Sequence, residues 1–243
     1  MKKISLTLAS AGMFILGSAY ASAAVLQEEA AASSKGFTQV LKEQFIQGGP
    51  AFMGIVLLCL ILGLAVAIER IIYLNMATTN TAALKESVEA ALASGGVEEA
   101  KNVCRETAGP VASIYYQGLE RSGEGLEAAE KAVVSYGGVQ MGQLEKNVSW
   151  LSLFIAIAPM LGFMGTVIGM IQAFQKIAAV GNLSASLIAG DIQVALLTTV
   201  FGLITAIILQ IFYNYIIAKI DAIVNDMEDS SISLIDMLAA SKK

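Results

Sequence analysis

Long uninterrupted apolar stretches dominate the hydrophobic pattern of this chain. Residues 51–68, 149–175 and 192–218 contain no charged side chain. An α-helix needs roughly 17–25 predominantly apolar residues to cross the hydrocarbon core of a bilayer, and each stretch supplies at least that minimum. The pattern therefore predicts an all-α integral membrane protein with three transmembrane helices, the longer of which extend into a helical cytoplasmic domain.

A shorter apolar run at the N-terminus has a different pattern. Lys2 and Lys3 precede it, and the small residues Ala21, Ser22 and Ala23 follow it. A basic start, a short apolar centre and a small-residue cleavage site are typical of a secretory signal peptide. We expect cleavage after residue 23, which places the mature N-terminus in a bacterial periplasm; an uncleaved anchor is the alternative.

Composition supports a membrane protein and excludes several other classes. Hydrophobic residues make up 56% of the chain and charged residues 14%, whereas soluble domains are about one quarter charged. The net charge of −5 gives no reason to expect nucleic acid as a partner. The chain has no histidine, and Cys59 and Cys104 fit no disulfide or metal pattern. The sequence thus predicts no metal, no cofactor and no enzyme activity.

Basic residues set the expected orientation. Seven lysines and arginines lie from Arg70 to Lys146, whereas the turn between the second and third apolar stretches carries Lys176 alone. The positive-inside rule therefore places residues 70–148 and the C-terminal tail in the cytoplasm. This agrees with the periplasmic N-terminus that the signal peptide requires.

The polar region between the first two spans is predicted to be helical. One helix stops at Gly95–Gly96, the next ends before Gly109–Pro110, and a short third follows. A long fourth helix is expected to run from Glu124 into the second span, although Gly137–Gly138 weakens its continuity.

The tail after Lys219 is also predicted to be helical and to pack against these helices. Its expected packing face carries Ile220, Val224, Met227, Ser231, Leu234 and Leu238.

These expectations divide the chain into eight segments. They are a signal peptide (1–23), a periplasmic segment (24–50), the first span (51–73), the cytoplasmic helical domain (74–148), the second span (149–175), a short periplasmic turn (176–191), the third span (192–218) and a cytoplasmic C-terminal helix (219–243). Within the periplasmic segment, the spacing of Phe37, Val40, Leu41 and Phe45 suits either a helix on the bilayer surface or a mobile linker.

Small residues form a stripe on the second span. Gly162, Gly165 and Gly169 are spaced three and four residues apart, so they share one helix face. A glycine costs about 1 kcal/mol relative to alanine inside a helix, but in lipid small residues let two helix backbones approach closely. The stripe therefore predicts a docking groove for another helix.

Hydroxyl groups on the third span have two possible roles. Thr198, Thr199 and Thr205 either bond to carbonyls of their own helix or line a hydrated path. Asp191, Thr198 and Thr205 recur every seven residues and share a face, but Asp191 stands at the entrance of the span, where it also suits a helix N-cap.

No Asp, Glu, Lys, Arg or His lies in the interior of any of the three spans. Glu69 and Arg70 stand at the cytoplasmic end of the first span, where an ion pair is expected. A proton relay through a membrane normally uses an ionisable group. If this chain takes part in proton flow, a partner must therefore bring the carboxylate.

Several motifs together resemble a known family. They are PMLGFMGTVIGM at 159–170, VALLTTVFGLITAI at 194–207 followed by Tyr213–Asn214, and Glu69–Arg70 at the end of the first span. In these motifs, their order and the predicted topology, residues 50–238 resemble the ExbB/TolQ/MotA proton-channel family, most closely its ExbB branch.

The resemblance implies a homopentamer in the lipid bilayer whose second and third helices enclose a pore. Single-span ExbD-like subunits would occupy the pore, each bringing a proton-binding aspartate, and a TonB-like protein would transmit the resulting force. By position, Thr166 and Thr199 match the pore-facing threonines of the family. The residues that match its packing positions are Pro159, Gly162, Gly165, Gly169 and Gly202.

One position departs from the family pattern. Many ExbB proteins have a glutamate directly before the ALLxT motif, where this chain has Val194, preceded by Gln193. Asp191 is the nearest carboxylate, so Asp191 and Gln193 are the candidates for a pore mouth on this subunit.

The sequence therefore predicts a stator subunit of the inner membrane that converts proton-motive force into work on a TonB-like protein, for import across an outer membrane. The alternatives are a TolQ-like stator for envelope maintenance or another motor, and a membrane scaffold that conducts nothing.

Overall fold

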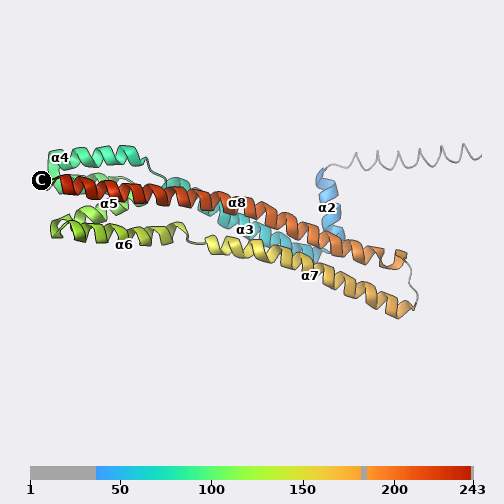
Figure 1. Ribbon diagram of the computed structural model, residues 1–243. Coiled ribbons are helices and arrows are strands. Elements are labelled where there is room, and N and C mark those ends of the chain that lie inside the picture. Colours follow the sequence, from blue (N-terminus) through green and yellow to red (C-terminus); the bar gives the residue numbers. More distant parts are fainter. Residues whose placement is uncertain (1–36, 182–184, 242–243) are drawn as a thin grey trace, which may run out of the picture. The chain divides into compact units, whose positions relative to one another are not determined.

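The computed structural model describes residues 37–181 and 185–241, and every secondary-structure element in these ranges is helical (Figure 1). The chain divides into two compact units, Met1–Pro50 and Ala51–Lys243. In the first unit the structure describes helix α2 (Phe37–Gln47). The predicted signal peptide lies outside the described residues.

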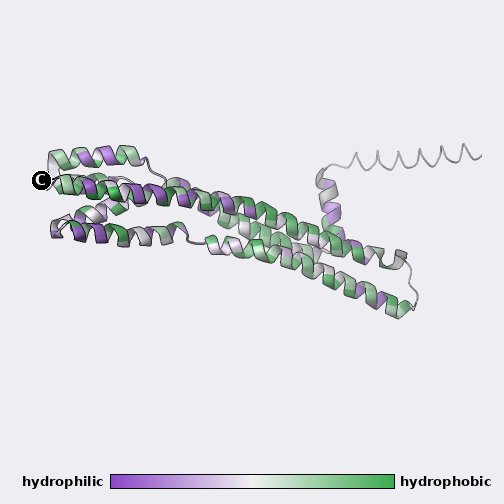
Figure 2. Cartoon of the chain, in the orientation of Figure 1, coloured by the Kyte–Doolittle hydropathy of each residue, from purple (hydrophilic) through white to green (hydrophobic). Residues whose placement is uncertain are grey.

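Three helices are long and apolar enough to cross a membrane, which confirms the predicted number of candidate spans. They are α3 (Pro50–Ala77), α7 (Val148–Val180) and α8 (Ala185–Ser241). Figure 2 shows that apolar residues cover α3, α7 and the N-terminal half of α8, whereas the C-terminal half of α8 also carries many hydrophilic residues. Helix α8 therefore continues without a break from an apolar into an amphipathic section.

Shorter helices pack together with this amphipathic section of α8. They are α4 (Thr81–Glu106), α5 (Pro110–Arg121), a 3₁₀ turn (Ser122–Glu124) and α6 (Leu126–Leu144). We call α4, α5, α6 and residues 219–241 of α8 the polar bundle.

The boundaries of these helices follow from local chemistry. The Asn80 side chain accepts a hydrogen bond from the Ala83 amide at 3.2 Å and so caps α4. Gly96, at φ 73°, interrupts α4 where a helix stop was predicted. Pro110 is the first residue of α5, where its missing N–H costs nothing.

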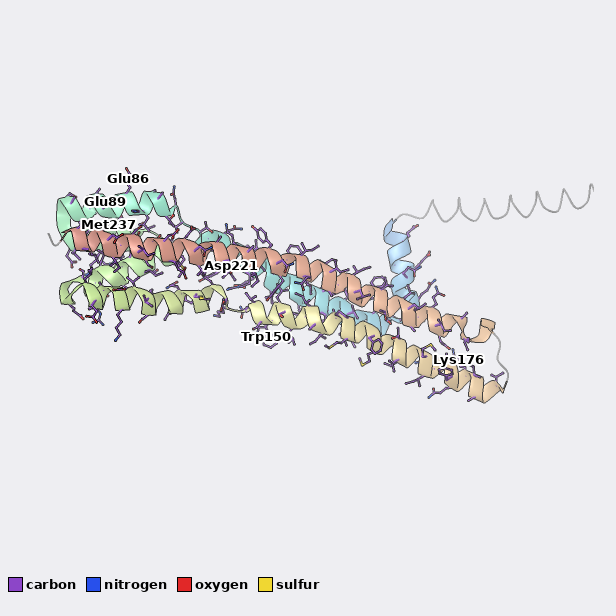
Figure 3. The ribbon with its side chains drawn as sticks, viewed as in Figure 1. Glu86, Glu89, Trp150, Lys176, Asp221 and Met237 are labelled. Atoms are coloured by element: carbon purple, nitrogen blue, oxygen red, sulfur yellow. The ribbon has the colours of Figure 1, made fainter. Side chains whose placement is uncertain are left out.

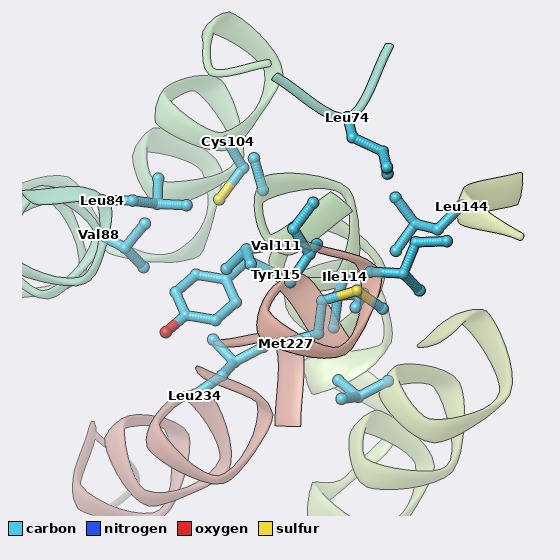
Figure 4. Packing of buried hydrophobic residues seen from close by; sticks show 14 of the residues in the cluster. Leu74, Leu84, Val88, Cys104, Val111, Ile114, Tyr115, Leu144, Met227 and Leu234 are labelled. Atoms are coloured by element: carbon cyan, nitrogen blue, oxygen red, sulfur yellow. The ribbon is translucent and has the colours of Figure 1, made fainter. Parts of the chain in front are cut away.

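A continuous apolar core holds the polar bundle together (Figure 4). Tyr115 and Leu119 of α5 and Leu234 of α8 are each at most 1% exposed. Burial raises the pKa of Tyr115 to about 12, and the neighbouring Ser230 hydroxyl opposes this shift. Helix α5 thus forms the centre of the bundle, and the other helices pack around it.

The C-terminal part of α8 packs as the apolar periodicity predicts. Ile220, Met227, Leu234 and Leu238 are buried, whereas Val224 and Ser231 are half-buried. The burial of Ile223 and Ser230 in addition shows that the packing face is centred slightly N-terminal of the predicted one. The amphipathic pattern thus identified the correct side of the helix.

The predicted continuous helix from Glu124 into the second span is wrong. A 3₁₀ turn replaces its start, and the chain leaves helical geometry at 145–147, where Asn147 adopts a left-handed conformation with φ 65°. Gly137–Gly138 stays helical within α6. Asparagine is one of the few non-glycine residues that visit this conformation routinely, so the break occurs there.

The turn between the second and third spans is shorter than the predicted 176–191. Helix α7 continues to Val180 and is followed by Gly181 at φ 69°, whose amide donates to the Ile177 carbonyl. This is the common left-handed helix C-cap. Helix α8 then begins at Ala185.

A first prediction concerns the core of the polar bundle. Leu234→Ala should destabilise the protein by about 2–5 kcal/mol, because it removes a buried side chain and leaves a cavity. The matched control is Ile232→Ala on the same helix, since Ile232 is 64% exposed. Thermal unfolding of the purified protein should show a clear fall of the midpoint for the first variant alone. Equal midpoints would contradict this description of the core.

A second prediction concerns the thiol of Cys104, which is 3% exposed. Burial raises its pKa to about 11. Because the thiolate is the nucleophile, alkylation of folded Cys59→Ala protein by iodoacetamide should still accelerate roughly tenfold per pH unit between pH 8 and pH 10. In detergent-unfolded protein the rate should level off near pH 9. Mass spectrometry measures both rates, and a plateau near pH 9 in the folded protein would contradict the raised pKa.

Candidate functional site

Helices α7 and α8 lie side by side along the length of α7 (Figure 1). The glycine stripe of α7 is buried in this contact. A Cβ atom on Gly162 would lie 3.0 Å from both the Thr198 carbonyl oxygen and Thr199 Cα. The two backbones therefore approach to a distance that leaves no room for a side chain.

The contact extends in both directions from Gly162. A Cβ on Gly169 would lie 2.8 Å from Cβ of Ala195, and one on Gly202 would lie 2.6 Å from the Ala158 carbonyl oxygen. Pro159 follows Ala158 inside α7 and is half-buried. The glycines thus come from both helices, and their absent side chains allow the close backbone contact that stabilises helix pairs in lipid.

Gly165 completes the stripe beside Thr198. A Cβ on Gly165 would lie 2.7 Å from Cβ of Thr198 and 3.0 Å from the Phe52 ring of α3. All three apolar helices therefore meet near this glycine.

Hydroxyl groups in this region bond to backbone carbonyls. Thr199 Oγ1 donates across the helix pair to the Gly162 carbonyl at 3.0 Å. Thr198 Oγ1 donates to the Ala195 carbonyl of its own helix at 2.7 Å, and Thr166 Oγ1 donates to Phe163 at 2.5 Å. Thr166 thus follows the intrahelical alternative and Thr199 links α8 to α7, whereas Thr198 does both, since its hydroxyl also reaches the Gly162 carbonyl at 3.4 Å.

The four threonines of the two helices differ in solvent exposure. Thr198 and Thr205 are 1% and 3% exposed, whereas Thr166 and Thr199 are half-buried. The two half-buried hydroxyls do not bond to each other, since each donates to a carbonyl of α7. Thr166 and Thr199 therefore retain accessible surface, which the buried pair lacks.

Asp191 lies on the face of α8 that it shares with Thr198, close to the end of α7. Its Oδ1 accepts from Lys176 Nζ at 2.7 Å, and its side chain is 13% exposed. Figure 3 shows Lys176 near the end of α7 that adjoins the turn. Because α8 already begins at Ala185, Asp191 is not an N-cap, and this alternative is wrong. Gln193, the second candidate for a pore mouth, is exposed.

The second carboxylate oxygen of Asp191 lies outside the ion pair. Oδ2 is buried and has no hydrogen-bond partner among the described residues. The Lys176 side chain is 51% exposed, so the pair lies at the border of the contact. The Lys176–Asp191 ion pair therefore marks this end of the α7–α8 contact.

A second ion pair lies at the other end of α7. Arg70 of α3 is 3% exposed, donates through Nε to Glu69 Oε2 at 2.6 Å and packs over the Tyr73 ring at 4.6 Å. Its Nη1 also donates to the Gln143 carbonyl near the end of α6 at 3.4 Å. Arg70 thus adds a second donor to a carbonyl in the last turn of α6, which also accepts from the Lys146 amide at 3.4 Å.

The junction between α6 and α7 is a feature that the sequence analysis missed. Asn147, the left-handed residue of this junction, lies within hydrogen-bonding reach of the Glu69 side chain. The available signal was the asparagine directly before an apolar span, because asparagine tolerates positive φ. Glu69 and Arg70 therefore hold a chain break rather than a continuous helix.

The charged candidate residues thus lie at opposite ends of α7. Glu69 and Arg70 lie near its N-terminus, and Asp191 lies near its C-terminus. Val148 and Lys176 are separated by about 42 Å of helix at 1.5 Å per residue. The interior between them contains hydroxyls, glycines and one proline but no Asp, Glu, Lys, Arg or His. In the described ranges, no three His, Cys, Asp or Glu side chains are grouped to hold a metal ion. The contact can thus pack helices and present hydroxyls, and it supplies no proton-binding group in its interior.

Comparisons with known proteins agree with these features. Residues 106–229 match the model of the MotA/TolQ/ExbB proton channel family. An ExbB homolog described as a biopolymer transport protein of Methanothermobacter thermautotrophicus is 32% identical over 169 residues, covering 69% of this chain and 60% of that protein. Biopolymer transport protein ExbB of Neisseria meningitidis is 27% identical over 193 residues, covering 72% and 86%.

A Tol-Pal system protein is also similar. TolQ of Haemophilus influenzae is 30% identical over 87 residues, covering 36% of this chain and 38% of TolQ. The chain thus spans less than two thirds of the length of this relative and of the Methanothermobacter protein.

A third prediction tests the helix contact. Gly202→Val should destabilise the α7–α8 pair by about 1–3 kcal/mol, because the added atoms meet the Ala158 carbonyl. Gly142→Val on α6 is the matched control, since a Cβ there meets no atom within 4 Å. Thermal unfolding in mild detergent should show a lower midpoint for Gly202→Val than for Gly142→Val. The close contact would be refuted by indistinguishable midpoints.

Proposed function

The chain belongs to the MotA/TolQ/ExbB proton channel family, and from this premise we propose that it is a stator subunit that converts proton-motive force into mechanical work. In this proposal it resides in a bacterial inner membrane. Its mature N-terminus and the α7–α8 turn are periplasmic, and the polar bundle and C-terminus are cytoplasmic.

One observation carries the proposal: the tightly packed α7–α8 pair presents half-buried hydroxyls but has no ionisable side chain in its interior. Such a pair suits the wall of a channel whose proton-binding group comes from elsewhere, since a proton relay normally uses an ionisable residue. A scaffold without conduction is the alternative, and partner identity separates the two.

The proposed assembly is a homopentamer around single-span ExbD-like subunits, each bringing an aspartate to the pore. One proton crossing ~150 mV releases about 3.5 kcal/mol, scaled from about 2.3 kcal/mol per 100 mV. Several protons per cycle therefore supply enough free energy to rearrange the partner and to act on a TonB-like transducer. The energised process is import across an outer membrane.

Individual residues receive roles within this assembly. Thr166 and Thr199 line the pore, because both residues keep accessible surface that Thr198 and Thr205 lack. Asp191 and Gln193 form the pore mouth, where Lys176 balances the carboxylate charge. Pro159 and the glycines of both helices keep α7 and α8 in contact.

The similarity to TolQ supports a second candidate, a stator of a Tol-Pal-type system that maintains the envelope. Both candidates share the channel mechanism and differ in the transducer that they move. Co-purification with a TonB-like protein or with a Tol-Pal system protein distinguishes them.

Native mass spectrometry of the complex from its own membranes tests the assembly. We expect five copies of this chain with one or two single-span partners, each with an aspartate in its span. A homo-oligomer that never carries such a partner would overturn the channel mechanism and favour the scaffold.

A fourth prediction tests pore lining. Thr199→Val, which has nearly the same shape, should lower proton flux into liposomes at least tenfold while the mass of the complex stays unchanged. Thr198→Val is the matched control, because Thr198 also reaches the Gly162 carbonyl, at 3.4 Å, but is only 1% exposed. An equal loss in both variants would assign the threonines to packing instead of to the pore.

A further inference from the structure

A groove outside the apolar spans has no place in the function proposed above. It consists of two adjoining hollows of about 420 and 220 Å³ between α6 and α8 in the polar bundle. The two hollows share Val133, Val134, Ser231 and Ile232. We call these two hollows together the α6–α8 groove.

The groove exposes large apolar side chains in an otherwise polar region. Val134 of α6 is 69% exposed and Ile232 of α8 is 64% exposed, and Met141 extends the same surface. Contiguous apolar surface outside a membrane commonly marks an interaction site. The groove therefore has the character of a contact surface that lacks its partner.

The glycines of α6 support this interpretation independently. Gly137 and Gly138 lie in mid-helix and line the groove. A Cβ on Gly138 would meet no atom within 4 Å, and one on Gly137 only Ile114 at 3.9 Å. Packing within the chain thus does not require them, although each costs about 1 kcal/mol relative to alanine. Because these two residues have no side chain, another backbone can approach α6 closely at this point.

The charges at the groove have one sign. Glu130, Glu228 and Asp236 line it, and no lysine or arginine does. None of the three carboxylates appears in a salt bridge within the described ranges. The groove therefore combines an apolar floor with an acidic rim, which favours a cationic occupant.

The length of the groove suits a short helix. Glu130 and Met141, which line its two ends on α6, are separated by about 16 Å of helix. An occupant helix of about 11 residues covers this distance, and helix-in-groove recognition uses apolar anchors on one face. Basic residues flanking these anchors would meet the acidic rim.

A second copy of this chain is a poor occupant. Four basic side chains of α4 and α5 bond within their own chain: Lys85 to Ser233, Lys101 to Glu98, Arg105 to Tyr116 and Arg121 to Glu124. The others of this region, Lys131, Lys146 and Lys219, lie on α6, directly after it and on α8. In the polar bundle 13 acidic residues stand against 6 basic ones, so a neighbouring copy brings mainly negative charge to an acidic rim.

We propose that the α6–α8 groove is the docking site for a cationic amphipathic helix of another protein. The site lies away from the α7–α8 contact, so the proposal does not depend on proton conduction.

Photo-crosslinking in the full-length chain in its native membranes provides the test. The photoreactive residue p-benzoylphenylalanine replaces Val134 or Ile232 in turn, and Glu89 on the exposed side of α4 serves as the control position (Figure 3). We expect the two groove positions, but not the control, to cross-link to one segment of another protein. Sequencing of the cross-linked peptide should show basic residues flanking an apolar helix face.

Charge reversal then tests the acidic rim. The double variant Glu228→Lys with Asp236→Lys should lower the cross-link yield at least fivefold, whereas Glu89→Lys should leave it unchanged. Native mass spectrometry checks that the complex still assembles. The proposal is overturned by cross-links to a second copy of this chain, by no groove-specific cross-link, by a segment that is not cationic, or by a yield that charge reversal does not change.

Discussion

The direct backbone contact between α7 and α8 is the constraint on which the rest of the structure depends. Lipid tails are as apolar as leucine, so burying leucine between helices gains little, and close contact must supply the stabilisation. Gly162 and Gly202 provide this contact because their Cα atoms face the opposite backbone without a side chain. Thr199 adds a hydrogen bond across it. The position of α8 in the apolar region is thereby set by the glycines.

The position of α8 in the apolar region also fixes its position in the polar bundle, because α8 is one continuous helix. Helix α8 has 57 residues and no break, which corresponds to about 85 Å at 1.5 Å per residue. Its apolar half packs on α7, and its other half contributes Leu234 and Leu238 to the core around α5. Helix α7, in contrast, is separated from α6 by the turn at Asn147, which Glu69 and Arg70 contact. A shift of α8 would therefore reach the polar bundle directly, whereas a shift of α7 meets a chain break first.

The features that sequence analysis predicted correctly depend on residues close together in the chain. Hydrophobic spans follow from composition within one helix, and the burial of Met227 and Leu234 follows from a 3.6-residue period. The break between α6 and α7 had only a weak local signal, an asparagine that tolerates positive φ. Gly137–Gly138 has the weaker intrinsic helix propensity, yet the break lies at Asn147, where Glu69 from a distant segment contacts the turn. Tertiary contacts thus overrode local propensity.

The sequence by itself determined the three apolar spans, the stripe of glycines on α7 and the lack of ionisable groups inside the spans, since each is a property of local composition and spacing. The tertiary structure alone decided that Thr199 bonds to the Gly162 carbonyl of α7 at 3.0 Å, while the shorter bond of Thr198, at 2.7 Å, is to its own helix. It likewise decided that Asp191 pairs with Lys176 instead of capping α8. Both outcomes depend on the distance between atoms of different helices, which the packing of the helices sets and which spacing along the chain does not specify.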